Sequence, residues 1–397
     1  MRERFAGLVP VDIRKIRRSR PRLVFRGYLL IGERPARNVS SHRKKEAARN
    51  DFPSGHTMSV SPDLREIPMN LHLPDVRTLE IHPAPWSNLR SSCRHSSETE
   101  ERNGLGVPLL LQAVEDAARL GYNFLTIAGE EPLFYPGLQP LCREAHRRRM
   151  LTSMILHRAT PTPAQLDWLR FSIDLLGIAI DARLVRHKRT RITRAAQSME
   201  DRLDLVRRSG IPFGIVFTLD QDNLSDLEWA AEYAAAQGAA MLQIRPSAGL
   251  TDEQMSTAWM MAECLGDLHR GRLVIHLNAT NRYNLPIEPD DLASWRRDVE
   301  REARYLGEIL SPLVIEHTGA VSPMRSGFPT QFGFGNLHEE RLSTMTERWI
   351  ETRSESFCRV YGAALEKART SDRTFGDLYE MLCVEARAGV RGMSASG

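Results

Sequence analysis

The chain has 397 residues, of which 42% are hydrophobic and 26% charged, and its formal net charge is +4. This length can bury one large α/β domain with an extension, or two modest domains. No apolar run approaches the roughly twenty residues that a membrane span requires. The five cysteines are scattered and follow no signal peptide, so we expect a reduced cytoplasmic protein without a disulfide framework.

The positive charge is concentrated at the amino terminus. Residues 1–50 contain fifteen Lys and Arg against four Asp and Glu, which leaves 39 basic and 46 acidic residues in the rest of the chain. Such an arm need not be folded to attract phosphates or acidic partners. It lacks, however, the interleaved aromatic residues that stack on nucleic-acid bases. We predict that residues 1–70 form a basic, disordered arm and that nucleic acid is not the partner.

From about Arg77 short apolar runs alternate with amphipathic segments, which predicts parallel strands joined by helices. The expected strands are Leu79–His82, Phe124–Ala128, Leu151–Leu156, Leu176–Ile180, Phe213–Leu219 and Met241–Ile244. The expected helices are Val107–Leu120, Leu138–Arg148, Pro163–Phe171, Ala195–Ser209 and Ser225–Gln237, the last with a capping box from Ser225 to Glu228. Six such units are fewer than the eight of a closed barrel. The prediction is an α/β fold, a partial (β/α)6 TIM-like barrel over residues 77–250.

After Leu250 the alternation loosens. The pattern predicts helices at Asp252–Arg270 and Asp290–Ile309, a strand at Leu273–Leu277, and a strand–turn–strand at Val314–Pro323. Further helices are expected between Glu339 and Arg387. Residues 251–388 are therefore predicted to form a C-terminal α+β accessory extension with helices, and residues 389–397 a tail.

The loop after the first expected strand reads Ser87-Asn88-Leu89-Arg90-Ser91-Ser92-Cys93-Arg94. It resembles the cluster loop of radical S-adenosylmethionine enzymes, where Cys-Asn-Leu-Arg-Cys-x-x-Cys holds a [4Fe-4S] cluster. Iron in such clusters is held by soft thiolates, and neither serine nor arginine can replace them. Ser87, Ser91 and Arg94 occupy the three ligand positions, and Cys93 lies one residue out of register, so the resemblance implies a degenerate cluster loop.

Further motifs of the same family follow in the family's order. The run Gly129-Glu130-Glu131-Pro132-Leu133 is similar to the family's Gly-Gly-Glu-Pro-Leu, in which backbone and carboxylate meet the methionyl amine of the cofactor. Glu130 replaces a glycine there and adds bulk where the backbone must approach a ligand. The resemblance implies a residual S-adenosylmethionine site at the strand ends, made of Gly129, Glu130, Glu131, Asp181, Asn223 and Arg245.

The stretch Pro312–Leu337 resembles the accessory extension of the peptide-modifying members of this family. In those members cysteines of the extension hold auxiliary clusters. This chain has no cysteine between Cys264 and Cys358, so we expect no auxiliary cluster and a module that docks a partner or peptide.

The loss of ligands beside an intact apolar pattern favours a degenerate protein of this fold. The main hypothesis is a non-catalytic binding or scaffolding pseudoenzyme without a cofactor, associated with peptide or natural-product modification. Its partner would be a peptide substrate or an intact radical S-adenosylmethionine paralogue. The alternative is an active enzyme that holds a [4Fe-4S] cluster through unorthodox ligands and abstracts hydrogen through a 5′-deoxyadenosyl radical.

Three other interpretations remain open at this stage. Cys93 and His95, with His82 and Glu131, could bind zinc, although their spacing is irregular. The barrel could bind a nucleotide or small anion through Gly129, Asp181, Asn223 and Arg245 without any cluster. A serine of the loop with His95 could act as a hydrolase pair, but no Gly-x-Ser-x-Gly elbow is present.

Overall fold

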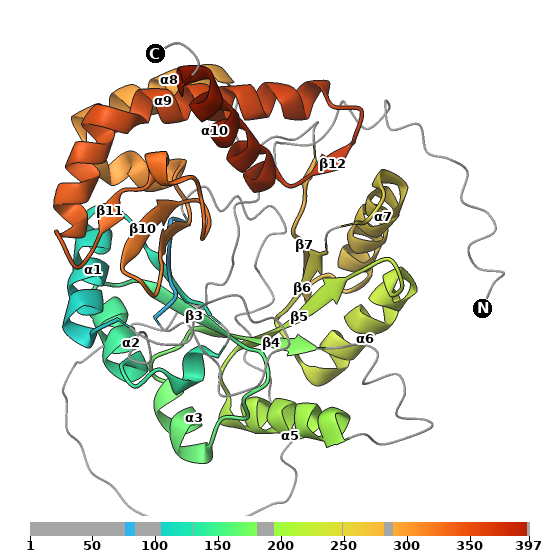
Figure 1. Ribbon diagram of the computed structural model, residues 1–397. Helices are drawn as coiled ribbons and strands as arrows, with labels where there is room; N and C mark the ends of the chain where they lie inside the picture. Colours follow the sequence, from blue (N-terminus) through green and yellow to red (C-terminus); the bar gives the residue numbers. More distant parts are fainter. Residues whose placement is uncertain are drawn as a thin grey trace, which may run out of the picture.

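The computed structural model describes residues 76–83, 105–129, 131–180, 194–247, 249–281 and 289–394. Its centre is one curved sheet of ten strands in the order β11-β10-β9-β1-β2-β3-β4-β5-β6-β7. Helices lie around the outside of the curve (Figure 1). The prediction of an α/β fold with a partial, TIM-like barrel is confirmed, because the sheet is mostly parallel and does not close.

Seven parallel strands form the barrel part of the sheet, one more than predicted. They are β1 (Thr78–Ile81), β2 (Phe124–Ile127), β3 (Leu151–Leu156), β4 (Leu175–Ile180), β5 (Phe213–Leu219), β6 (Met241–Pro246) and β7 (Val274–Leu277). Each pairs in parallel with the next, from β1·β2 to β6·β7. The expected strand at 273–277 therefore belongs to the barrel rather than to the extension.

The connecting helices are amphipathic and bury one face on the sheet. They are α1 (Val107–Arg119), α2 (Leu138–Arg147), α3 (Pro163–Leu169), α5 (Arg194–Ser209), α6 (Leu227–Gln237) and α7 (Asp252–Leu268). Capping boxes begin α3 and α7, where Thr162 with Gln165 and Thr251 with Gln254 satisfy the first free backbone N–H groups. Gly238 ends α6 in the left-handed conformation, which costs glycine little.

The C-terminal extension continues the barrel sheet. β9 (Leu313–Ile315) pairs in parallel with β1, and β10 (Ala320–Pro323) and β11 (Gly335–Asn336) follow in antiparallel order. The expected strand–turn–strand is thus confirmed. Because β9 lies directly against β1, the extension and the barrel share one hydrophobic core.

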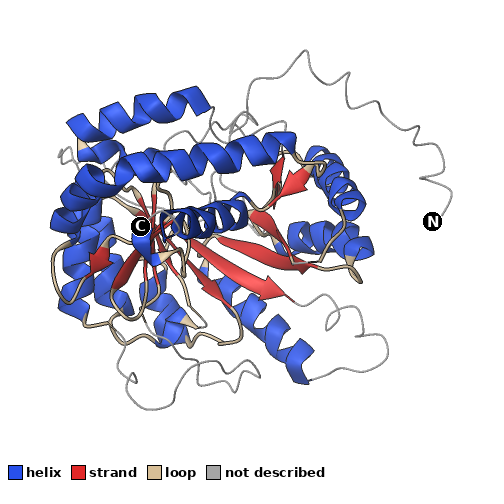
Figure 2. Ribbon diagram, turned by 45° about the horizontal axis from the view of Figure 1, so that its top comes forward, coloured by secondary structure: helices blue, strands red, loops and turns tan. Residues whose placement is uncertain are grey.

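Three helices complete the fold, α8 (Pro289–Arg301), α9 (Leu342–Thr370) and α10 (Leu378–Ser394). A buried aromatic cluster fixes α9 to the extension: the rings of Phe334 and Trp349 stack with centroids 4.8 Å apart, and Trp349 donates a hydrogen bond to the carbonyl of Phe332. Stacked aromatic pairs of this kind add to the free energy gained from burial. Figure 2 shows the strands gathered inside the surrounding helices.

Three local predictions differ from the structure. Ser225 does not cap α6, since a 3-10 turn at Leu224–Asp226 precedes that helix and Asp226 is its N-cap residue. The long helix expected at 290–309 breaks at Glu302 into α8 and a 3-10 segment, Ala303–Glu308. α10 continues to Ser394, through most of the residues expected to form a tail.

A small two-stranded sheet lies beside α7. β8 (Thr280–Asn281) pairs antiparallel with β12 (Phe375–Gly376), and the carboxylate of Asp252 accepts the backbone N–H groups of Thr374 and Phe375. This contact joins the start of α7 to the segment between α9 and α10. Within the described ranges, the helices are all too short or too polar to cross a membrane.

Candidate functional site at the strand ends

The inner face of the curved sheet carries several polar side chains among apolar ones. Side chains alternate between the two faces of a strand, and one set, which includes Ile81, Ile127 and Leu156, is fully buried. The helices cover the outside of the curve (Figure 1). The alternate set faces the inside of the barrel and contains Glu80, Thr126, Ser153, Thr218, Gln243, Arg245 and His276. In such folds, ligands bind at the carboxyl ends of the parallel strands, where polar side chains converge.

Glu131 is a buried carboxylate at the carboxyl end of β2, with only 5% of its surface exposed. Its Oε2 atom accepts two backbone hydrogen bonds, from the N–H groups of Arg158 and Ala159, each 2.8 Å long. Its Oε1 atom is buried and has no hydrogen-bond partner within the described residues. Burial of an acceptor without a partner costs free energy. A ligand that donates a hydrogen bond to this oxygen would therefore bind favourably.

Arg202 is a buried cation close to this carboxylate, and the sequence analysis missed it. It lies on α5, is 4% exposed, and donates to the carbonyls of His157 (2.8 Å) and Ala179 (3.0 Å). Burial lowers the pKa of Arg202 and the nearby charge of Glu131 opposes that effect. The spacing of Arg202 in the sequence could have indicated its burial. It lies three residues after Met199, on the apolar helix face that Leu203 and Val206 continue.

Two histidines flank the site in their neutral form. Burial lowers the pKa of His276 on β7 to about 4, and the Arg245 guanidinium lowers it further. Desolvation also lowers the pKa of His157, which follows β3; Glu131 opposes this shift, and Arg245 and Arg202 add to it. At neutral pH both imidazole rings are therefore uncharged.

Two of the predicted residues have local structural roles. Gly129 adopts a φ of 116°, a conformation that residues with a side chain rarely reach, so this turn after β2 requires glycine. Asn223 is buried, accepts a hydrogen bond from the N–H of Asp220 (2.8 Å) and donates one to the carbonyl of Thr218 (2.9 Å). Asn223 thus closes the loop after β5 and uses its amide within the protein.

Several predicted residues lie outside the described ranges. They are the cluster-loop residues Ser87, Ser91, Cys93 and Arg94, together with His95, Glu130 and Asp181. Of the predicted site residues, the structure describes Gly129 and Glu131 after β2, Asn223 in the loop after β5, and Arg245 near the carboxyl end of β6.

The zinc interpretation receives no support from the residues in view. His82 pairs with Glu80 at 2.7 Å, and Glu131 is held by backbone N–H groups. Within the described ranges, there is no group of three His, Cys, Asp or Glu residues that could hold a metal ion. The proposed ligands Cys93 and His95 lie outside those ranges.

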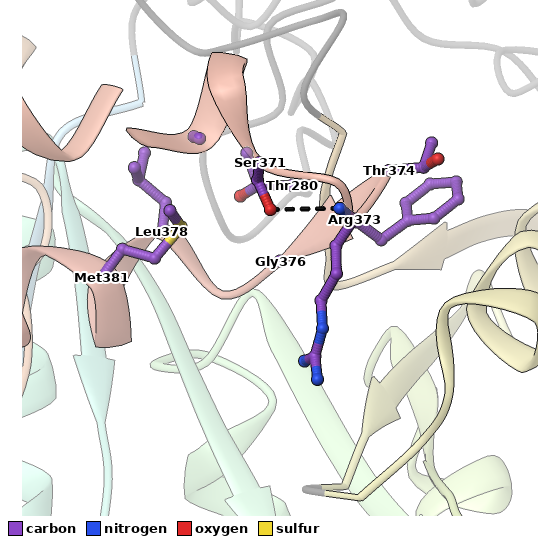
Figure 3. A pocket seen from close by; sticks show the side chains of 9 residues that line it. Thr280, Ser371, Arg373, Thr374, Gly376, Leu378 and Met381 are labelled. Carbon is purple, nitrogen blue, oxygen red and sulfur yellow. Dashed lines mark hydrogen bonds between the residues drawn. The ribbon is translucent and has the colours of Figure 1, made fainter. Parts of the chain in front are cut away.

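A separate small hollow of about 20 Å³ lies between β8, β12 and the start of α10. Figure 3 shows its lining side chains, among them Thr280, Arg373 and Met381. It does not include Glu131, Arg202 or Arg245, so it is distinct from the site at the strand ends.

Comparisons with known proteins place this geometry in context. No protein-family profile matches the chain. A PqqA peptide cyclase of Ruegeria pomeroyi is 30% identical over 141 residues, which cover 34% of this chain and 36% of the relative. The chain thus matches about a third of the length of this curated relative.

The fold resembles that of SuiB from Streptococcus suis, whose crystal structure contains S-adenosylmethionine. The two share 12% identity with a TM-score of 0.54, and the match covers 72% of this chain and 68% of SuiB. SuiB bound to its precursor peptide SuiA matches with a TM-score of 0.52, 11% identity and coverage of 71% and 66%.

These relatives overturn one prediction. The expectation that the chain uses no cofactor is contradicted, because SuiB, which shares the fold, binds S-adenosylmethionine, and the chain is similar in sequence to a PqqA peptide cyclase. That prediction relied on the missing thiolates and on altered strand-end motifs such as Glu130. These comparisons agree on two points: the chain has the fold of SuiB, and about a third of it is similar in sequence to a PqqA peptide cyclase.

Proposed function

We propose that the chain binds S-adenosylmethionine at the carboxyl ends of its parallel strands and acts in the modification of a peptide. The observation that carries this proposal is the open Oε1 atom of Glu131. A buried carboxylate oxygen without a partner is a receptor for a cationic donor, and the methionyl amine of the cofactor is such a donor. Glu131 occupies the position of the family's cofactor-binding glutamate.

The neighbouring residues fit the cofactor. Gly129 supplies the unusual backbone conformation of the turn beside Glu131, and Arg245 on β6 supplies a cation for a carboxylate or ribose. Bound there, S-adenosylmethionine would supply a sulfonium centre as a source of a radical or of a transferable group. The chain's own residues would bind and orient the amino-acid end of the cofactor.

The cysteines do not fit a family-type cluster. Among the described cysteines, Cys142, Cys264, Cys358 and Cys383 lie on the helices α2, α7, α9 and α10. Burial raises the pKa of Cys142 and raises that of Cys358 to about 11, which disfavours their thiolates. The loop after β1 supplies Cys93 alone, where the family uses three thiolates. A cluster would need further ligands, and we assign no reaction step to it.

Two functions are compatible with cofactor binding, and the relatives favour the first. In one, the chain is an active radical enzyme whose cluster uses Cys93 with His95 or a cysteine from a partner chain. In the other, it is a scaffold that holds a peptide, or supports an intact paralogue, without radical chemistry. The peptide as substrate is supported by the similarity to PqqA peptide cyclase and to SuiB, which was crystallised with its precursor peptide.

Calorimetric titration with S-adenosylmethionine tests the binding proposal. Wild-type protein should bind, and Glu131→Gln should bind at least about tenfold more weakly, because a hydrogen bond from an ammonium group to a carboxylate contributes about 1.5–3 kcal/mol. Glu380→Gln on α10, whose side chain is exposed, is the matched control and should bind like the wild type. Equal affinity for the wild type and Glu131→Gln would refute the assignment of Glu131.

Anaerobic reconstitution with iron and sulfide separates the two functions. About four irons per chain and an electron paramagnetic resonance signal that changes with cofactor would identify a radical enzyme. Folded protein that binds S-adenosylmethionine but no iron would identify a scaffold. Cys93→Ala should abolish iron binding in the first case and change nothing in the second.

A further inference from the structure

We propose that Arg202 is a positioning residue, which holds the backbone segment 157–159 so that Glu131 keeps one oxygen open for the cofactor. This inference rests on the proposed function, since the ligand of that oxygen is taken to be S-adenosylmethionine. Arg202 itself touches no ligand in this arrangement. It acts through the three residues that follow β3.

Segment 157–159 is held from both sides. Arg202 donates from Nη1 to the carbonyl of His157 at 2.8 Å. The next two N–H groups, of Arg158 and Ala159, donate to Oε2 of Glu131, also at 2.8 Å. Three consecutive residues thus link the guanidinium to the carboxylate, and a displacement of the segment would disturb both.

The second terminal nitrogen of Arg202 extends the link to another strand. Nη2 donates to the carbonyl of Ala179 in β4 at 3.0 Å. Arg202 therefore bridges α5, the end of β3 and β4. A guanidinium that is only 4% exposed loses most of its hydration, and these two carbonyls together with the nearby Glu131 charge offset that loss.

The two opposite charges are near each other but are not directly paired. Within the described residues, no hydrogen bond or ion pair joins Glu131 to Arg202, and both Oε1 of Glu131 and Nε of Arg202 are buried without partners. The two hydrogen bonds that Arg202 donates from its terminal nitrogens go to the backbone carbonyls of His157 and Ala179 and orient its guanidinium toward them rather than into a bidentate pair with Glu131. Such a pair would occupy Oε1 and leave no acceptor on Glu131 for the cofactor.

The link also sets which part of Glu131 a ligand meets. With Oε2 fixed by two backbone N–H groups, the carboxylate cannot rotate without losing both bonds. A cationic ligand therefore meets a preorganised oxygen rather than a mobile side chain, which reduces the entropy that binding must overcome. Removal of Arg202 should free the segment and weaken binding of the cofactor through Glu131.

The test uses three variants of the full chain. Arg202→Met removes the charge and both hydrogen bonds with a side chain of comparable length. Arg202→Lys keeps the charge and can donate to a carbonyl. Arg208→Met removes an arginine from the same helix where the side chain is 75% exposed, and is the matched control.

Two measurements are made on each variant, namely hydrogen exchange of the Arg158 and Ala159 amides and calorimetric titration with S-adenosylmethionine. Arg202→Met should exchange faster at these two amides, while the amides inside β3 and α5 stay protected, and should bind about tenfold more weakly. Arg202→Lys should recover part of both effects. Arg208→Met should match the wild type.

A double-mutant cycle with Glu131→Gln distinguishes positioning from general support of the fold. If Arg202 acts through Glu131, Arg202→Met should change the affinity of the Glu131→Gln protein little. Additive losses, or unchanged exchange at residues 158 and 159 in Arg202→Met, would overturn the inference and leave the proposed function intact. Wild-type protein that does not bind the cofactor would overturn the proposed function, and the exchange rates would still decide whether Arg202 holds the segment.

Discussion

Asp116 on α1 and Arg341 at the start of α9 form a two-pronged ion pair, although 225 residues separate them in the sequence. Arg341 donates from Nη2 to Oδ1 at 2.8 Å and from Nε to Oδ2 at 3.3 Å. Asp116 is fully buried, and its Oδ2 also accepts the N–H and hydroxyl of Ser343 in the first turn of α9. One carboxylate of the barrel thereby caps the longest helix of the extension, where the helix dipole favours negative charge.

Replacement of Asp116 by alanine should lower the free energy of unfolding by about 1–3 kcal/mol, because it leaves the N–H of Ser343 and the guanidinium of Arg341 without their acceptor. Asp116→Asn should cost less, since its carbonyl oxygen can still accept. Urea denaturation followed by circular dichroism measures both variants. If both variants were as stable as the wild type, the carboxylate would not be the group that holds α9.

A second buried carboxylate should make stability depend on pH. Asp174 accepts hydrogen bonds from His146 (2.9 Å) and from the N–H of Thr152 (2.8 Å). Burial favours its protonated form, but these bonds outweigh burial, and the pKa of Asp174 lies below its ordinary value. The stabilisation is therefore fully present above the unfolded-state pKa near 3.9 and is lost as pH falls through the lower folded-state value.

Asp174→Asn should accordingly be less stable than the wild type at pH 7, and the difference should shrink below about pH 4. Unfolding in urea at pH 7, 5 and 3 measures this. His146→Gln can still donate to Asp174 and should show a smaller loss at pH 7. A difference between wild type and Asp174→Asn that stayed constant down to pH 3 would contradict the assigned role of the carboxylate.

The barrel was predictable because its signal is local. Runs such as 151–156 and 213–219 are bounded by breaks, and both strands are observed with the predicted bounds. The pairing of β9 with β1 was not predictable, since contacts between strands more than 230 residues apart leave no periodic trace in either segment. Ser225 failed as a cap because the loop that Asn223 closes leads into a 3-10 turn before α6.

The candidate site was predictable only where a family motif marks it. Glu131 and Arg245 were found by their place in such motifs, and both lie on the polar side of the strand ends. Arg202 carries no motif, and a single arginine on an apolar helix face is ordinarily interpreted as a boundary residue. Its proposed role rests on the backbone carbonyls to which it donates, in segments 23 and 45 residues away.

His276 should titrate well below an ordinary histidine, with a pKa of about 4, because burial and Arg245 disfavour its charged form. A depressed histidine pKa destabilises the folded state progressively as pH falls from about 6.5 towards the folded-state value. The ring proton signals in a nuclear magnetic resonance titration report this pKa directly. His276→Gln should lose less stability than the wild type between pH 6.5 and 4.5, and a midpoint near 6.5 in the wild type would show that the ring is not desolvated.

Two glycines should respond in opposite directions to the same substitution. Gly177 lies in β4, and a Cβ atom there would be 2.9 Å from Cγ1 of Ile155 and 3.3 Å from Cγ2 of Val216, the neighbours on either side. Gly177→Ala should therefore cost about 1–3 kcal/mol through overpacking. Gly266 lies inside α7 with no atom within 4 Å of an added Cβ, so Gly266→Ala should add about 0.5–1 kcal/mol through helix propensity. Equilibrium unfolding measures both variants. A stabilised Gly177→Ala would mean that the strands β3 to β5 can separate, and that the curved sheet which carries Glu131 and Arg245 is less tightly packed than its contacts indicate.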